Sequence, residues 1–467
     1  MKQFILLLKA KKSKIATLFI VVLFCSSCKK DLKIEPPINQ LSSELVFSSD
    51  NTATSAVTGI YSSMMATNEQ VFNSALTLYG GLSADELYYY TPNYTDELYT
   101  NQLSIASHSM IDRNIWTPCY NYIYMANACI EGITSSPALS PAIKSTLTGE
   151  AKFIRAFCFF TLTNLFGDVP LALSTNPGIN STSPRSSKAD VYYQIINDLE
   201  ESVNLLPENY ASAERVRPNK WAANALLARV YLYNKEWAKA ETKATKVIDA
   251  GPYMLLPNLN DVFLGSSKEA IWQLKPVNPS RNTYEGRTIL PSSASAQPFY
   301  LLTPVQVSAF ETGDLRKSSW AKAHTFSGQT YYYPYKYKVR GAAGVPITEY
   351  YMVLRLAEQY LIRAEAKAQQ NNLSGAASDV NKIRNRSGLT NINPVNQVSM
   401  LLAIEQERRV ELFSELAHRW FDLKRTDRAN SMLSPLKGTN WQSTDQLWPI
   451  PQDQINLNSA LTQNLGY

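Results

Sequence analysis

The sequence predicts a mainly α-helical fold, a tetratricopeptide-like solenoid of helical pairs with a loop-rich insertion that contains a little β-structure. Apolar residues recur at steps of three and four across about 50–250 and 350–425, as on helices that bury one face. Between these stretches, over about 251–348, that period is lost and Gly, Pro, Ser and Asn are frequent. We therefore expect a single domain over 41–467, ending in an irregular tail at 426–467 that docks onto the helices.

One helical pair is predicted between Leu354 and Arg386. Its first apolar stripe falls on Leu354, Ala357, Leu361, Ala364 and Ala368. A polar run at 369–374 ends this helix, and Ser374 is placed to cap the next one by accepting from an orphan backbone N–H. The second helix has its own stripe, at Ala376, Val380 and Ile383. Because neither helix can bury its stripe alone, each needs the other and a neighbouring pair.

A second pair, over Lys220–Asp249, fits the spacing of a tetratricopeptide repeat more fully. The small, aromatic, small, apolar and proline positions of that repeat fall on Ala228, Tyr231, Ala240, Val247 and Pro252. The first pair matches this pattern only at Ala364, Ala376 and Ile383. Small residues let paired helices approach closely, and the proline stops the second helix. Two matches predict a solenoid, although other helix pairs can show such spacings by chance.

Four further helices are expected before these pairs. Their ranges are Thr52–Met65, Trp116–Ile133, Pro141–Phe166 and Lys188–Leu206. The third of them carries a stripe that indicates packing, formed by Phe153, Phe157, Phe160 and Leu165.

The insertion contains two strand candidates. Ala270–Leu274 is a short apolar run. In the other, alternate positions are occupied by Tyr331, Tyr333, Tyr335 and Tyr337. That period of two predicts a half-buried strand, which Pro334 confines to an edge or a bulge.

Residues 1–27 predict a lipoprotein signal peptide. Five lysines precede an apolar core, Ile15–Phe24, that is too short to span a bilayer. Small residues then lead to Cys28, as in the lipobox of bacterial lipoproteins, so we expect Cys28 to carry the lipid and 28–40 to form an extended tether. An ordinary secretory signal is the alternative, because Cys25 occupies a position that is usually aliphatic.

The formal net charge of +6 belongs mostly to this signal. Without its five lysines, 40 of the 45 basic residues remain against 39 acidic ones. A nearly neutral mature protein gives no reason to expect nucleic acid as a partner. Apart from Cys28, the cysteines beyond the signal are Cys119, Cys129 and Cys158. They are expected to be buried free thiols, with a Cys129–Cys158 disulfide as the alternative.

The sequence lacks the spacings that catalysis or a bound cofactor requires. The only histidines are His108, His324 and His418, and none lies at metal-ligand spacing from another His or Cys. Beside Arg408 and Arg419, carboxylates recur at steps of four, at Glu407, Glu411 and Glu415. Such arrays usually form ion-pair networks. We therefore expect a binding protein with no catalytic residue, no cofactor and no metal.

Four groups of residues carry a family resemblance. They are Arg355–Glu358 with Ala364–Ala366; Asn381, Arg384, Asn385, Arg386 and Gly388; Glu407, Arg408, Glu411, Leu412, Glu415, Arg419, Asp422, Leu423 and Arg425; and Trp448–Pro451 with Gln463, Asn464, Gly466 and Tyr467. These residues resemble motifs of the SusD/RagB family of bacterial outer-membrane lipoproteins. The resemblance covers both ends of the chain, and the middle by architecture.

The resemblance implies a helical domain that carries an irregular region with a shallow ligand surface. Such a protein is lipid-anchored in the outer membrane, faces the cell exterior, and acts as a lid over a TonB-dependent transporter of the SusC type. It captures glycan pieces, or in some members peptides, for import. The implied partners are therefore that transporter, an oligosaccharide or peptide, and the outer membrane.

Tyrosines with polar neighbours are the residues suited to bind saccharides, because flat rings cover the C–H face of a sugar while Asn, Asp and Arg pair with hydroxyls. One such group comprises Asp85, Tyr88, Tyr89, Tyr90, Asn93 and Tyr94. It follows no regular period, so we expect some of its rings to be exposed on a loop, with buried packing as the alternative for each ring. Further candidates in the insertion are Arg281, Tyr284 and Trp320.

Capture of oligosaccharides is the function that these features favour. A peptide-binding lid of the same kind of transporter is one alternative, which charged anchors and few exposed rings would favour. A tetratricopeptide-like scaffold that binds only protein partners is the other.

Overall fold

Helices form most of the protein in the computed structural model, which describes residues 43–91 and 96–467. Glu44–Tyr467 make up one compact unit. The predicted signal peptide at 1–27, the lipid-bearing Cys28 and the tether at 28–40 lie outside the described residues. Within the described ranges, none of the helices combines the length and the apolar character needed to cross a bilayer.

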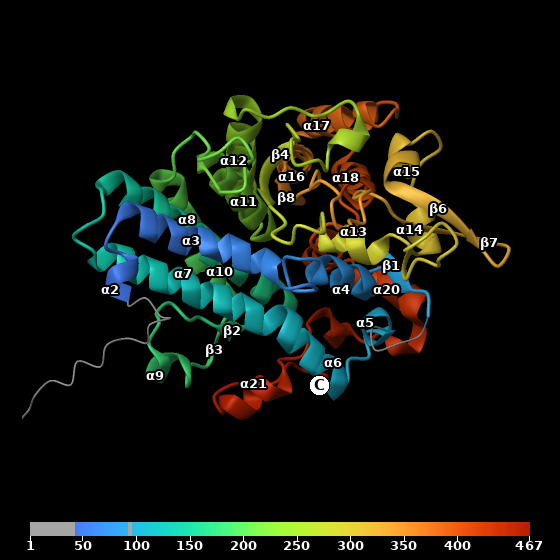
Figure 1. Cartoon of the computed structure of the whole chain (residues 1–467). Coiled ribbons are helices and arrows are strands. Elements are labelled where there is room, and N and C mark those ends of the chain that lie inside the picture. The colour runs from blue at the N-terminus through green and yellow to red at the C-terminus, as the bar shows by residue number, and fades with distance from the viewer. Residues whose placement is uncertain (1–42, 92–95) are drawn as a thin grey trace, which may run out of the picture. The chain divides into compact units, whose positions relative to one another are not determined.

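Four long helices form one block of the structure (Figure 1). They are α3 (Asp50–Ala66), α7 (Thr117–Ser135), α8 (Pro141–Phe166) and α10 (Lys188–Leu205). All four confirm the predicted helices. Helix α8 has its predicted bounds, because Pro141 suits the first turn and Gly167 ends the helix with a φ of +76°. Its stripe is buried as expected, with the Phe153 ring edge-on to Trp272 at 4.9 Å between centroids.

Two helical pairs lie beside this block and pack on each other. Helix α11 (Lys220–Tyr233) pairs with α12 (Trp237–Ala250), α16 (Leu356–Gln369) pairs with α17 (Leu373–Arg386), and α12 contacts α16. Helix α18 (Gln397–Glu411) packs on the second pair. The proline position, Pro252, is exposed just beyond α12. The other repeat-like positions are buried, at Ala228, Tyr231, Ala240, Val247, Ala364, Ala376 and Ile383. The predicted pairs are therefore confirmed.

The structure corrects two details of the second pair. Leu354 belongs to strand β8 (Tyr351–Arg355), where it lies opposite Trp272; it is fully buried there, so its apolar character was no sign of a helix. Ser374 is not the cap. The side-chain oxygen of Asn372 accepts from the Gly375 N–H at 3.0 Å, so the helix begins one residue before Ser374.

The described strands form four two-stranded antiparallel sheets. They pair β1 (Leu87–Tyr89) with β5 (Tyr300–Leu302), β2 (Val169–Pro170) with β3 (Arg185–Ser186), β4 (Ala270–Leu274) with β8, and β6 (Ala321–Phe326) with β7 (Gln329–Pro334). Strand β4 has its predicted bounds. Figure 1 shows the β6–β7 hairpin projecting beyond α14 (Pro304–Ser308) and α15 (Leu315–Trp320).

Strand β7 confirms that part of the tyrosine run is extended, but the predicted alternation of burial is wrong. Tyr331 and Tyr332 are both half-buried, whereas Tyr333 and Pro334 are both buried. Tyr335 and Tyr337 lie beyond the end of the strand. Burial increases along β7 because its turn end projects from the protein while its Pro334 end is covered, so one end rather than one face is buried.

The remaining helices are short. They are α2 (Ser43–Val46), α4 (Ala75–Ser83), α5 (Asp96–Thr100), α6 (Ile105–Ile111), a π-helix (Asp112–Trp116), α9 (Pro177–Asn180), α13 (Tyr284–Ile289), α19 (His418–Arg425), α20 (Ala429–Lys437), α21 (Gln452–Leu457), and 3-10 helices at Leu259–Asp261, Gly438–Asn440 and Ser443–Gln446.

The C-terminal tail docks onto the end of α8, as expected. Trp448 is buried, and its backbone N–H donates to the Leu165 carbonyl at 2.9 Å. The side-chain amide of Asn464 donates to the carbonyls of Phe166 and Trp448 at 2.9 and 2.7 Å. The tail therefore satisfies two of the last carbonyls of α8, which have no partner within the helix.

Three cysteines lie in the described part of the chain. Cys119, Cys129 and Cys158 are buried free thiols, so the alternative Cys129–Cys158 disulfide is not formed. Burial raises the pKa of the Cys129 thiol to about 12, which keeps it protonated and unreactive at neutral pH.

Candidate functional site

The predicted tyrosine cluster begins in a strand rather than a loop. Tyr88 and Tyr89 belong to β1, where Tyr89 lies opposite Tyr300 of β5. The pairing continues by one residue, because the Tyr90 N–H donates to the Phe299 carbonyl at 2.8 Å. Consecutive aromatic residues favour β-structure, and β5 supplies the partner strand, which explains the departure from the expected loop. All three tyrosines are half-buried, so part of each remains accessible.

Further ring contacts widen this cluster. The Tyr89 ring stacks on Phe299, with centroids 5.7 Å apart and planes inclined by 5°, and Phe299 is 53% exposed. The Tyr90 ring lies edge-on to Phe326 and Tyr331 of the β6–β7 hairpin, at 6.0 and 5.4 Å. We define the aromatic face as Tyr88, Tyr89, Tyr90, Phe299, Phe326 and Tyr331. It has two sides, because adjacent strand residues alternate: Tyr89 and Phe299 lie on one side of β1, and Tyr88 lies on the other, beside Tyr90 and Tyr331. Stacked and edge-on rings support one another in fixed orientations.

The hydroxyl of Tyr88 stays protonated at neutral pH. Burial, and then the neighbouring Tyr331, Tyr99 and Tyr90, raise the pKa of Tyr88 to about 12. A neutral phenol can both donate and accept a hydrogen bond, so it suits a ligand hydroxyl.

A groove of about 520 Å³ continues along the β6–β7 hairpin. Lys322 lies opposite Tyr333 and His324 lies opposite Tyr331, and directly opposed residues share one face of the hairpin. We define the hairpin groove by its lining residues, which are Leu290, Pro291, Ser293, Ala294, Lys322, Ala323, His324, Thr325, Tyr333, Tyr335, Lys338 and Arg340. Tyr331 therefore connects the groove with the aromatic face.

The hairpin groove has a basic lining. The Nζ atoms of Lys322 and Lys338 lie 4.6 and 5.1 Å from the centroid of the Tyr335 ring, within the range of cation–π attraction. Arg340 Nε donates to the Leu290 carbonyl at 3.1 Å. Burial lowers the pKa of Lys338, although the charges of Glu349 and Asp261 act in the opposite direction. Burial, and then Arg287, lower the pKa of Arg340.

Asp85 and Trp320 are buried, which corrects their assignment to the site. Asp85 is 1% exposed, and Arg419 donates to both of its carboxylate oxygens, at 2.8 and 3.0 Å. Trp320 is fully buried, and its Nε1 donates to the Leu259 carbonyl at 2.9 Å. Neither can contact a ligand in this conformation. The sequence around Asp85 and Trp320 could not show that they are buried, because their hydrogen-bond partners, Arg419 and Leu259, lie far away in the sequence.

Two further predicted site residues, Arg281 and Tyr284, contact each other rather than the aromatic face. The Arg281 guanidinium lies 5.6 Å from the centroid of the Tyr284 ring, and Arg281 Nη1 donates to Asn68 Oδ1. Both side chains are half-buried, so their role as ligand contacts stays a prediction. Asn93 and Tyr94 lie outside the described residues, and their role also stays a prediction.

Sequence reasoning did not include Phe299, Phe326 or Tyr331 in the site. The period of two around Tyr331 indicates strand packing, and the two phenylalanines belong to no motif in the loop-rich sequence. The available signal was the aromatic content around the β6–β7 turn. It could not be connected with Tyr90, because the hairpin and β1 meet only in the folded chain.

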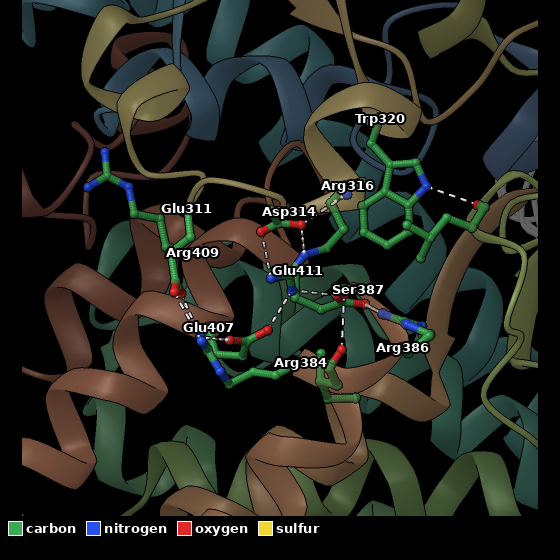
Figure 2. A network of polar contacts seen from close by, with 12 residues as sticks. Glu311, Asp314, Arg316, Trp320, Arg384, Arg386, Ser387, Glu407, Arg409 and Glu411 are labelled. Carbon is green, nitrogen blue, oxygen red and sulfur yellow. Dashed lines mark hydrogen bonds and ion pairs between the residues drawn. The ribbon is translucent and has the colours of Figure 1, made fainter. Parts of the chain in front are cut away.

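Glu407 and Glu411 of α18 form an ion-pair network, as the charge pattern predicts, but their arginine partners are not Arg408 and Arg419. Figure 2 shows Arg316 directed at Asp314, Glu407 and Glu411, with oxygens 2.9, 2.6 and 3.0 Å from its guanidinium nitrogens. The third predicted carboxylate, Glu415, lies beyond the end of α18 and forms an ion pair with Arg355.

Glu411 illustrates why this network is unsuited to proton transfer. Burial acts to raise the pKa of Glu411. The charges of Arg386, Arg355 and Arg316 outweigh this effect and hold the pKa well below its usual range. A carboxylate that stays ionised among guanidinium groups stabilises the fold rather than exchanging protons with a substrate.

Two family models match the chain. One, described as "Starch-binding associating with outer membrane", matches residues 32–232, and the other, described as the SusD family, matches residues 283–467. The chain is 25% identical to SusD-like protein P25 of Formosa agariphila, over 98% of this chain and 100% of that protein. It is also 25% identical to the starch-binding protein SusD of Bacteroides thetaiotaomicron, over 72% of this chain and 74% of that protein.

Solved structures share this fold. One, described as a laminarin binding SusD-like protein, has a TM-score of 0.75 and 22% sequence identity. The similarity covers 89% of this chain and 99% of that one.

Proposed function

Because this chain belongs to the SusD/RagB family, we propose that it captures oligosaccharides at the cell surface for import, as the lid of a SusC-like TonB-dependent transporter. Two similar proteins support a carbohydrate ligand, since one is named for starch and the other for laminarin. The proposal places the protein on the outer membrane, acylated at Cys28 after removal of residues 1–27. It is a binding function without a catalytic step.

The aromatic face is the observation that carries this proposal. Tyr89 and Phe299 present stacked rings, and Phe299 is 53% exposed. Exposed flat rings suit the C–H surface of sugars. On the other side of β1, the phenol of Tyr88 suits ligand hydroxyls. An open face also fits a lid, because the ligand has to be released to the transporter after capture.

Isothermal titration calorimetry of the mature protein tests the proposal, with starch and laminarin oligosaccharides and short peptides in one panel. Phe299→Ala should weaken saccharide binding by about tenfold, because one stacking ring is lost. Tyr193→Ala is the matched control, since Tyr193 is 70% exposed on α10 and should not affect binding.

Each outcome of this panel selects one function. Binding of peptides but of no saccharide would replace the proposal with a peptide-binding lid. Binding of neither class would favour a scaffold for protein partners. Saccharide binding that Phe299→Ala leaves unchanged would move the site away from the aromatic face.

A further inference from the structure

The hairpin groove holds positive charge that the protein itself does not neutralise. Among its lining residues, Lys322, Lys338 and Arg340 are basic and none is a carboxylate. None of the three forms an ion pair with another residue in the described part of the chain. The groove therefore has a positive potential that attracts anions.

The acidic groups nearest to these cations do not line the groove. Glu349 accepts from the backbone N–H groups of Lys338 and Val339, at 2.7 and 3.1 Å. Burial raises the pKa of Glu349 to about 7, so part of its charge is lost at neutral pH. Asp261 acts on Lys338 by its charge, but it also lies outside the lining. These two carboxyl groups leave the positive charge of Lys322 and Arg340 uncompensated.

The buried arginines beside α18 are paired with anions. Buried Arg316 and Arg355 both form ion pairs with Glu411, at 3.0 and 2.6 Å. In the hairpin groove, by contrast, the two lysines are oriented toward the Tyr335 ring, and Lys338 also donates to the neutral amide oxygen of Asn260. A basic cluster without built-in counterions is the arrangement expected where a ligand supplies the negative charge.

The hairpin groove is positioned to act together with the aromatic face. Lys322, His324 and Phe326 occupy alternate positions of β6, so their side chains are on the same side of the strand. They span about 13 Å, at about 3.3 Å per residue. A chain of sugar rings that stacks at Phe326 can therefore extend toward Lys322.

We propose that the captured saccharide is acidic, and that its carboxylate or sulfate group binds Lys322, Lys338 and Arg340 while its rings contact the aromatic face. This inference rests on the proposed capture of saccharides and adds the chemical class of the ligand. Hydrogen bonds from ammonium and guanidinium groups to an anion are stronger than those to a neutral hydroxyl. An acidic oligosaccharide should therefore bind more tightly than a neutral one of the same length.

Titration calorimetry of the mature protein with three soluble probes tests this inference. The probes are a laminarin oligosaccharide as the neutral sugar, an oligogalacturonate as the carboxylate and a sulfated galactan oligosaccharide as the sulfate. At least one acidic probe should bind about tenfold more tightly than the neutral one. That advantage should decrease as salt is added, because the cations lie near the surface.

The double variant Lys322→Gln with Arg340→Gln should abolish the advantage of the acidic probe and leave binding of the neutral probe unchanged. Lys239→Gln is the matched control. Lys239 is also an exposed lysine over an aromatic ring, with its Nζ 5.1 Å from the Tyr231 centroid, but it lies on α12. The melting temperature of each variant shows whether it is folded.

The probes distinguish a carboxylate from a sulfate as the bound group. They also distinguish failure of the acidic-ligand inference from failure of saccharide capture. Tighter binding of oligogalacturonate would assign a carboxylate, and tighter binding of the galactan would assign a sulfate. A neutral probe that binds as tightly as both acidic ones would overturn the acidic assignment and leave saccharide capture standing. If none of the three probes and no starch oligosaccharide binds, saccharide capture itself is overturned.

Discussion

Arg419 of α19 donates two hydrogen bonds to the carboxylate of Asp85, from Nε to Oδ1 at 2.8 Å and from Nη2 to Oδ2 at 3.0 Å. Arg409 adds an ion pair to Oδ2 at 3.0 Å. Burial acts to raise the pKa of Asp85, but the contacts with Arg419 outweigh this effect and hold the pKa below its usual value. Because Asp85 lies two residues before β1, these contacts fix the strand that carries Tyr88 and Tyr89 against the C-terminal helices.

Asp85→Asn should lower the free energy of unfolding by about 3 kcal/mol, because it leaves Arg409 buried without an ion pair and Arg419 with Glu405 as its remaining partner. Urea denaturation followed by tryptophan fluorescence measures this loss. Glu208→Gln is the control, since Glu208 is exposed and its pairing with Lys220 should contribute less than about 0.5 kcal/mol. A variant of normal stability that has lost saccharide binding would instead place Asp85 in contact with the ligand.

The pKa of Glu86 is raised, whereas the pKa of the neighbouring Asp85 is lowered. Burial, and then the charge of Asp85, raise the pKa of Glu86 from 4.5 to about 8. Between pH 4.5 and about 8, the Glu86 carboxyl is ionised in the unfolded chain but still protonated in the folded protein. The folded state therefore binds more protons in that window, and the stability contributed by Glu86 is complete below pH 4.5 and is lost as pH rises toward about 8.

Glu86→Gln should remove this dependence on pH. The free energy of unfolding of the variant, minus that of the wild type, should rise by several kcal/mol across the window, at about 1.4 kcal/mol per pKa unit. Urea denaturation at a series of pH values measures the difference. Glu208→Gln should give a flat difference over the same series. A flat difference for Glu86→Gln would mean that the Glu86 carboxyl ionises near its usual pH in the folded protein.

Sequence periodicity was sufficient to locate the long helices, because each buries a stripe and has a local signal at its ends. Helix α8 was predicted at its observed bounds, from Pro141 to the residue before Gly167. Periodicity failed at Leu354, where an apolar residue next to a helical stripe belongs to a strand. Pairing with β4 decided its conformation, and that pairing depends on a segment far away in the sequence.

The candidate site was less predictable, because its parts come together only through contacts between distant segments. Tyr90 could be found from local crowding of aromatic residues, but Phe326 reaches it only when the β6–β7 hairpin folds back. Asp85 seemed available because its partner Arg419 lies near the other end of the chain. The near-zero net charge of the sequence beyond residue 27 likewise gave no sign of the basic lining of the hairpin groove.

Glu411→Gln tests the buried ion-pair network of α18. Glu411 pairs with Arg316, Arg355 and Arg386, so the variant should lose about 3 kcal/mol or more of unfolding free energy at neutral pH. Because the folded pKa of Glu411 is held well below 4.5, its contribution is present above that pH and is lost as pH falls below it. The gap between wild type and variant should therefore narrow in acid.

Denaturation of both proteins at neutral and acidic pH measures this gap. Glu201→Gln is the control, because Glu201 is 55% exposed and forms an ion pair with Lys152 at the surface. It should change stability little at any pH. A gap for Glu411→Gln that stays constant into acid would contradict the assignment of Glu411 as an ionised member of the network.

Tyr331 and Tyr332 provide a matched pair for the aromatic face, because adjacent strand residues point to opposite faces. The Tyr331 ring lies 5.4 Å from that of Tyr90, whereas Tyr332 lies below Lys317 of α15. Tyr331→Ala should therefore weaken saccharide binding by about tenfold and Tyr332→Ala should leave it unchanged, as measured by titration calorimetry. Both rings are half-buried, so similar melting temperatures are expected. Equal loss of affinity in both variants, or a larger loss for Tyr332→Ala, would show that the ligand binds the other face of the hairpin.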